Sequence, residues 1–158
     1  MKHKLDYDKK EFLIEVTDSS IKPIDSKKYY GILKDAYKIY VVKYNNDFLY
    51  VGITKTYISS RFLLGFNATK EVGNNGYHGY QWVNSHKGKA LTLTVFTFLN
   101  MTKAEENERK TIESIEAELV YQIRNKIKKW PECQNEIHFY NNGNEIIELG
   151  EKLFEELK

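Results

Sequence analysis

The sequence has very little cysteine, since Cys133 is the only one in 158 residues. A single cysteine excludes an internal disulfide and a zinc site built from several cysteines. His138 lies five positions further on, but two residues do not make a structural zinc site. Cys133 is therefore interpreted as a structural or surface thiol.

Long apolar runs and a large net charge are also missing. No stretch of about 18 apolar residues is present, which excludes a membrane-spanning helix. Residues 1–6 include an acidic residue and lack the apolar stretch of a signal peptide, so we expect a cytoplasmic protein with no membrane partner. The net charge of +2 excludes a strongly basic coat for nucleic acid, although local basic clusters could still contact phosphates.

Proline and glycine are scarce, at 2 and 9 residues, whereas aromatic residues make up 14% of the chain. This composition argues against intrinsic disorder. The length suits one domain with a sizeable core, and no internal repeat or low-complexity linker divides the chain. We therefore expect a single domain over residues 1–158.

The clearest local pattern predicts a β-hairpin. Residues 37–44 (YKIYVVKY) and 48–53 (FLYVGI) are rich in β-branched and aromatic residues, and residues 45–47 (NND) are typical of a turn. A three-residue loop would pair position 44 with 48, 42 with 50 and 40 with 52. Apolar residues at odd positions should then share the core face: Ile39, Val41, Leu49, Val51 and Ile53.

The other face of this hairpin carries two tyrosines. In the predicted register Tyr40 and Tyr50 are diagonal neighbours, and Gly52 lies opposite Tyr40. The two hydroxyls should therefore face a gap. Ordinary sheet packing is the alternative interpretation, because tyrosine is common in strands and this chain has 12 of them.

The remaining elements are predicted from periodicity and capping signals. Residues 56–66 should form a short helix with Tyr57, Ile58, Phe62 and either Leu63 or Leu64 turned inward. Residues 67–87 should form a long loop with a helical turn at 80–85, followed by a strand at 90–99. A long helix should begin at Thr102, with Glu105 completing a capping box, and stop at Trp130-Pro131. At the ends of the chain we expect a helix near 26–35 and a terminal helix after residue 144, with a hairpin across residues 141–143 as the alternative to the latter.

The predicted elements follow the order strand, strand, helix, strand, helix, and candidate site residues lie on four of them. These are Lys38-Ile39-Tyr40 and Tyr50-Val51-Gly52 on the hairpin, Arg61 on the following helix and Glu116 on the long helix. This arrangement resembles the GIY-YIG nuclease superfamily over residues 37–130, with Lys38 standing where the family usually has glycine. The resemblance implies an α+β fold in which a small three-stranded antiparallel sheet is flanked by helices, with extensions at 1–36 and 131–158.

The resemblance also implies roles for these residues. Tyr40 would be the general base toward water, Tyr50 would orient the water and phosphate, and Arg61 would contact the scissile phosphate. His78, in the loop after Arg61, would support them. Glu116 would hold one divalent cation, Mg²⁺ or another such as Mn²⁺. A tyrosine with a pKa of about 10 is a poor base near pH 7 unless positive charge favours its phenolate.

Glu116 also stands out from helix geometry. It flanks the apolar stripe of the long helix, and its neighbours three and four positions away include no cation. A half-buried carboxylate without a local cation needs an outside partner, for which Mg²⁺ and a salt bridge to another element are the alternatives. Glu118 lies about 200° around the helix and is ranked second.

Basic residues near these elements are candidate contacts to nucleic-acid phosphates. They are Lys87, Lys89, Arg124, Lys126, Lys128 and Lys129. By the resemblance, Asn135 after Pro131 is a further site residue, with Asn141 and Asn142 as alternatives.

The sequence thus predicts a divalent-metal-dependent endonuclease that hydrolyses DNA phosphodiester bonds, acting as a monomer or homodimer. The alternatives are a non-catalytic nucleic-acid-binding module of the same fold and a protein interaction domain.

Overall fold

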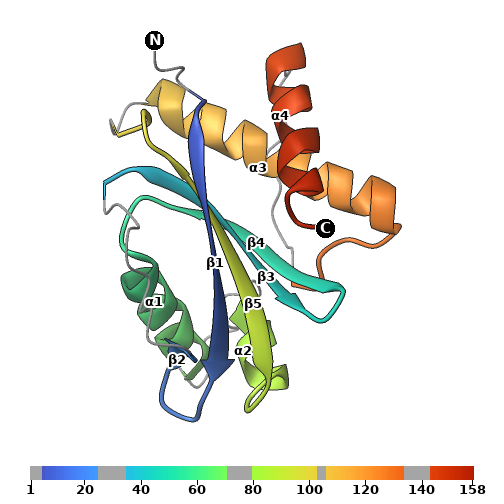
Figure 1. The fold of residues 1–158 in the computed structure, drawn as a ribbon. Coiled ribbons are helices and arrows are strands. Elements are labelled where there is room, and N and C mark those ends of the chain that lie inside the picture. Colours follow the sequence, from blue (N-terminus) through green and yellow to red (C-terminus); the bar gives the residue numbers. More distant parts are fainter. Residues whose placement is uncertain (1–4, 25–34, 71–79, 103–105, 134–142) are drawn as a thin grey trace.

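The computed structural model describes residues 5–24, 35–70, 80–102, 106–133 and 143–158. These residues form one antiparallel sheet with strand order β2-β1-β5-β3-β4 (Figure 1). The strands are β1 (Tyr7–Val16), β2 (Ile21–Pro23), β3 (Tyr37–Tyr44), β4 (Asp47–Thr54) and β5 (Ala90–Phe98).

The predicted three-stranded sheet is wrong, because the sheet has five strands. The two additional strands come from the segment taken as an N-terminal extension. In β1 the buried residues Phe12, Ile14 and Val16 alternate with more exposed ones. This strand pairs with β5 over nine residue pairs, from Tyr7↔Phe98 to Glu15↔Ala90. No strand was predicted in this segment, because charged residues fill the first half of β1 and hide the alternation of its second half.

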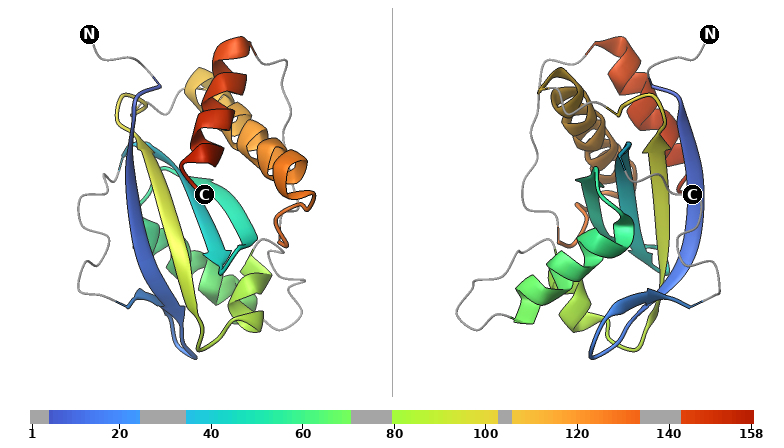
Figure 2. Two further views of the ribbon diagram at one scale, coloured as in Figure 1. Left: turned by 45° about the vertical axis from the view of Figure 1, so that its right-hand side comes forward. Right: turned by 90° about the vertical axis from the view of Figure 1, so that its left-hand side faces the viewer.

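Helices cover both faces of the sheet. Helices α1 (Ile58–Lys70) and α2 (Gln81–Ser85) contribute Phe62, Phe66 and Trp82 to a core with Tyr40 and Leu93. Helices α3 (Glu106–Ile127) and α4 (Asn144–Glu155) belong to a second core on the other face. That core contains Ile39, Val41, Phe96, Ile115 and Leu153. Figure 2 shows α1 and α2 grouped together, apart from the crossed pair α3 and α4.

The β3–β4 hairpin follows the predicted register at its open end and departs from it at its turn. The pairs Tyr40↔Gly52 and Val42↔Tyr50 are confirmed, whereas Tyr44 pairs with Asp47 rather than with position 48, because the register shifts after Val42. The loop is shortened to two residues, and Asn45 adopts a positive φ of 53°. The shift also moves Leu49 into the core with Tyr40, away from the predicted face.

The helices and the fifth strand lie close to their predicted positions. The strand at 90–99, the turn at 80–85, the long helix and the terminal helix are confirmed. In α1 the buried residues are Ile58, Phe62 and Phe66, whereas Tyr57, Leu63 and Leu64 are exposed, contrary to the prediction. The predicted helix near 26–35 and the Glu105 capping box fall outside the described residues, apart from Asp35 and Thr102.

Candidate functional site

The two hairpin tyrosines lie side by side on the face that α1 and α2 cover. The ring centroids of Tyr40 and Tyr50 are 5.8 Å apart. Opposite Tyr40, a Cβ atom at Gly52 would lie 2.6 Å from Tyr40 Cζ and 2.7 Å from Tyr50 Cε1. The predicted gap is therefore filled by the two rings, and glycine is required because no side chain fits there.

A third tyrosine completes this group. Tyr80 Oη lies 2.7 Å from Tyr40 Oη, a hydrogen bond in which either oxygen can donate. The Tyr80 ring is 5.5 Å from that of Tyr50 and rests against Gly65 of α1. Tyr40, Tyr50 and Tyr80 are called the tyrosine cluster below. Tyr80 was not predicted as a site residue, although a glycine within an α-helix is a signal of close approach by another group.

Arg61 reaches the tyrosine cluster through Tyr80. Its guanidinium carbon lies 4.9 Å from the centre of the Tyr80 ring. The next residue, Phe62, packs edge-on against Tyr40 at 5.8 Å. A guanidinium over a phenol ring is attracted to the electron-rich face of that ring. The structure therefore brings Arg61, Tyr80 and Tyr40 into one contact chain.

The tyrosine cluster is shielded from solvent. Tyr40 and Tyr80 are 0% exposed and Tyr50 is 4% exposed. The sequence predicted that both hairpin hydroxyls face a gap, whereas the two tyrosines are buried in a core. The reason is that Leu49, Phe62 and Trp82 extend the core over this face of the hairpin.

Lys38, in the position where the resembling family has glycine, is also fully buried. It lies on the same face as Tyr40, between Thr54 and Thr97 in the sheet register. Its Nζ donates a hydrogen bond to the Ala36 carbonyl at 2.7 Å. Burial lowers the pKa of Lys38 to about 8, opposed by the negative charge of Asp35. A second cation thus lies on the face that carries the tyrosine cluster.

Glu116 lies in a different layer from these residues. It is half-buried on α3, beside Ile112, Ile115 and Leu119 of the second core. Burial, and then the charge of Glu113, raise the pKa of Glu116 to about 8. No hydrogen bond or ion pair joins its carboxyl group to another described residue. The structure therefore brings together Tyr40, Tyr50 and Arg61, but it does not bring Glu116 into contact with them.

The metal prediction rests on this carboxyl group. No group of three or more His, Cys, Asp or Glu side chains suited to a metal occurs among the described residues. Magnesium is nevertheless often bound through one or two carboxylates together with substrate phosphates. Glu116 fits such a role because burial keeps its carboxyl group protonated, and a bound cation would compensate the negative charge of the ionised form. Glu118, ranked second, packs its Cβ against Gly150 of α4.

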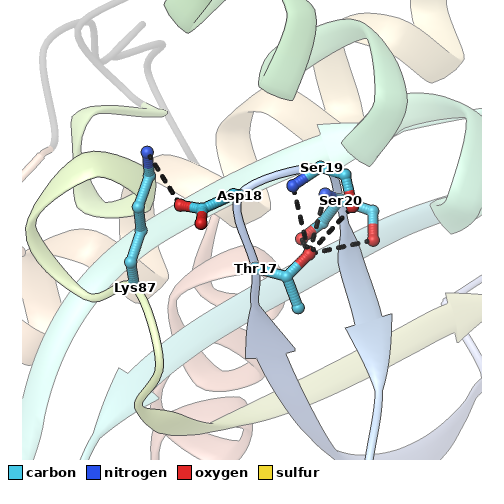
Figure 3. Close-up of polar contacts among 5 residues, drawn as sticks. All are labelled: Thr17, Asp18, Ser19, Ser20 and Lys87. Atoms are coloured by element: carbon cyan, nitrogen blue, oxygen red, sulfur yellow. Dashed lines mark hydrogen bonds and ion pairs between the residues drawn. The ribbon is translucent and has the colours of Figure 1, made fainter.

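The predicted phosphate contacts differ in their surroundings. Lys87 lies 3.8 Å from the exposed carboxylate of Asp18, in the turn between β1 and β2 (Figure 3). Within this turn, Thr17 Oγ1 accepts a hydrogen bond from the backbone N–H of Ser20. Lys89 Nζ lies over the Tyr44 ring, and the Arg124 guanidinium lies over that of Trp130. Exposed lysines follow at the end of α3: Lys126, Lys128 and Lys129. His78 and Asn135 lie outside the described residues.

The lone cysteine is structural in this fold. Cys133 is buried, and its N–H donates to the Leu49 carbonyl at 2.9 Å. Burial raises the pKa of its thiol, opposed by a hydrogen bond from the Trp82 backbone.

The described helices include none that is both long enough and apolar enough to cross a membrane. No protein-family model, curated protein or solved structure matches this chain.

Proposed function

We propose that the chain is a divalent-metal-dependent endonuclease that hydrolyses DNA phosphodiester bonds. The observation that carries the proposal is the contact chain from Arg61 through Tyr80 to Tyr40. It places the Tyr40 phenol, whose phenolate can accept a proton, beside a second phenol and a guanidinium that both favour the phenolate.

In this proposal Tyr80 donates its hydroxyl hydrogen bond to the Tyr40 phenolate, and hydrogen bonding to a charged form stabilises it. The Tyr40 phenolate then takes the proton from the attacking water and becomes a neutral phenol. Arg61 adds positive charge next to the same pair and is the group suited to a phosphate oxygen. Tyr50 fixes the orientation of the Tyr40 ring through their contact.

Glu116 is the residue that would hold the divalent cation. When bound, the cation would supply Lewis-acid stabilisation of charge on the phosphate. Since Glu116 lies in a different layer from Tyr40 and Arg61, this role requires a rearrangement that brings it to the same phosphate. Neighbouring backbone phosphates would be contacted by the predicted basic residues, which are Lys87, Lys89, Arg124, Lys126, Lys128 and Lys129. The affinity for DNA should therefore fall as the salt concentration rises. Because Tyr40 is fully buried, turnover requires that DNA binding open the cover of the tyrosine cluster.

The test is nicking of supercoiled plasmid in Mg²⁺ or Mn²⁺. Tyr40→Phe, Arg61→Ala and Glu116→Gln should each lower the rate by about 100-fold or more, the range typical of lost proton transfer or charge stabilisation. Matched controls are Tyr44→Phe on the same strand, Arg109→Ala and Glu118→Gln on α3, which should retain the wild-type rate. If all three site variants nick at the wild-type rate, the site assignment is wrong.

A non-catalytic nucleic-acid-binding module is the second candidate. The burial of Tyr40 and the buried Lys38 in the place of a glycine favour it. Folded wild-type protein that binds DNA at low salt, yet leaves duplex, single-stranded and branched DNA intact with every divalent metal tried, would establish this alternative and remove the catalytic roles.

A further inference from the structure

Basic side chains gather where α3 ends. The chain from Tyr121 to Trp130 carries four cations and no acidic residue: Arg124, Lys126, Lys128 and Lys129. No ion pair joins any of these cations to a carboxylate in the described part of the chain. Asp47 and Glu132 line a small cavity beside Trp130. Even with both counted, four cations against two carboxylates leave an excess of positive charge.

The turn after α3 folds Trp130 back onto Arg124. Lys128 has a positive φ of 67° and donates its N–H to the Arg124 carbonyl at 3.0 Å, which ends the helix. The Arg124 guanidinium then lies over the Trp130 ring, 5.8 Å from its centre. Two residues later, the Glu132 N–H donates to the Phe48 carbonyl of β4 at 3.0 Å. Trp130 is therefore held in a defined position.

Trp130 remains open to solvent although Arg124 lies over its ring. It is 47% exposed, and Tyr121 and Ile127 of α3 are 46% and 44% exposed. Trp82, by contrast, is 0% exposed in the core. The helix dipole favours cations at the end of α3, which accounts for the lysines but not for the exposed ring beside them. An exposed indole among cations is the combination that stacks a base and neutralises the adjacent phosphates.

We infer that the end of α3 binds single-stranded DNA, with one base stacked on Trp130 and the basic residues on the adjacent phosphates. The inference rests on the proposed function for the choice of DNA, and it deepens that function by naming DNA with an unpaired segment as the substrate class. Bases in a duplex are stacked on each other, whereas an unpaired base can offer its face to an indole. Nucleic acid supplies a π-face beside every charge, whereas an acidic peptide supplies the charge alone.

The site at Trp130 lies close to the tyrosine cluster. After Trp130 the chain runs along β4, the edge strand of the sheet, where the Cys133 N–H donates to the Leu49 carbonyl at 2.9 Å (Figure 1). Cys133 belongs to the same core as Tyr50. Three residues span at most about 11 Å, so this core begins within that distance of Trp130. A strand bound at Trp130 is thus in reach of the proposed catalytic residues.

The test for stacking is fluorescence anisotropy of a labelled oligothymidine of about twelve nucleotides with the full chain in EDTA, which prevents cleavage. An abasic strand of the same length carries the same charge without bases. The wild type should bind oligothymidine about tenfold more tightly than the abasic strand, equivalent to about 1.4 kcal/mol. Trp130→Ala should bind both strands equally, and Trp130→Phe should retain a preference. The control Tyr57→Ala, which removes another exposed aromatic side chain, should bind as the wild type does.

The phosphate contacts are tested through the salt dependence of binding. For a single strand, the slope of log K against log salt concentration is about −0.7 for each phosphate neutralised. Lys126→Gln/Lys129→Gln should therefore weaken the binding of both strands alike and reduce the slope by about 1.4. The control Lys110→Gln, whose lysine pairs with Glu106 near the start of α3, should leave the slope unchanged.

Four results would overturn the inference. They are equal binding of the oligothymidine and abasic strands by the wild type, an unchanged preference in folded Trp130→Ala, tighter binding of a duplex or a polyglutamate peptide, and binding of oligouridine alone. Failure of the proposed function is seen separately. A chain that binds oligothymidine through Trp130 but nicks no DNA keeps this site and loses its catalytic roles. A chain that nicks plasmid, yet binds oligothymidine equally well after Trp130→Ala, loses only this site.

Discussion

Gly65 of α1 lies directly beneath the ring of Tyr80, so that a Cβ atom at position 65 would stand 2.6 Å from Tyr80 Cζ. The contact fixes the ring whose hydroxyl bonds Tyr40. A helix glycine is normally unfavourable by about 1 kcal/mol relative to alanine. Its presence here is explained by the space that Tyr80 needs.

Gly65→Ala should therefore destabilise the fold despite the better helix propensity of alanine. The methyl group must displace a ring that is packed against Trp82 and Phe62, and overpacking of a core costs about 1–3 kcal/mol. Urea unfolding measures the change. Ser60→Ala, at an exposed position of the same helix, is the control and should shift stability by less than about 0.5 kcal/mol. A stabilised Gly65→Ala variant would show that Tyr80 can move away freely.

The hydroxyl pair of Tyr40 and Tyr80 should show energetic coupling. In a double-mutant cycle with Tyr40→Phe, Tyr80→Phe and both together, we expect a coupling free energy of about 1 kcal/mol, because the two oxygens share one buried hydrogen bond. Urea unfolding of the four proteins gives the value. Additive effects of the two changes would mean that the hydroxyls do not support each other.

The sequence predicted the local elements better than the sheet and the site. Strong alternation at 90–99 and the tyrosine hairpin were sufficient to place β5, β3 and β4. Strand β1 was missed because charged residues fill its first half, where pairing with β5 rather than side-chain pattern determines the strand. Periodicity likewise cannot show that Tyr80, 40 positions after Tyr40, bonds to it. Nor could it show that both faces of the hairpin are buried, since this depends on how α1 and α2 pack.

Glu116 should make stability fall as pH rises through the neutral range. Its pKa is raised to about 8 in the folded chain, above its value of about 4.3 in the unfolded chain. Between these values the unfolded chain releases the proton and the folded chain keeps it, so the free energy of unfolding decreases with pH. Glu116→Gln should be more stable than the wild type by about 1–3 kcal/mol at pH 8 and by little at pH 4. Urea unfolding across this range, with Glu118→Gln as control, measures it. A pH-independent difference would contradict the raised pKa.

Binding of Mg²⁺ at Glu116 should release a proton below pH 8. The ligand must be a carboxylate, whereas the free carboxyl group is protonated there. Calorimetric titration in two buffers of different ionisation enthalpy should detect about one proton per cation at pH 6.5. Less Mg²⁺ should be needed for half-saturation at pH 8.5. If Glu116→Gln binds Mg²⁺ as the wild type does, the metal lies elsewhere.

Lys38 should show the opposite pH dependence. Its pKa is lowered to about 8 in the folded chain, below its unfolded value of about 10.4. At pH 7 both states carry the proton, and the folded chain bears the full penalty of a buried ammonium. Between about pH 8 and 10.4 the folded chain loses its proton first, so this penalty declines as pH rises. Lys38→Met should therefore be more stable than the wild type by about 1–3 kcal/mol at pH 7, with the difference shrinking toward pH 10. Guanidinium unfolding at both values tests this, and a Lys38→Met variant that is less stable at pH 7 would show that the hydrogen bond to Ala36 outweighs the burial of charge.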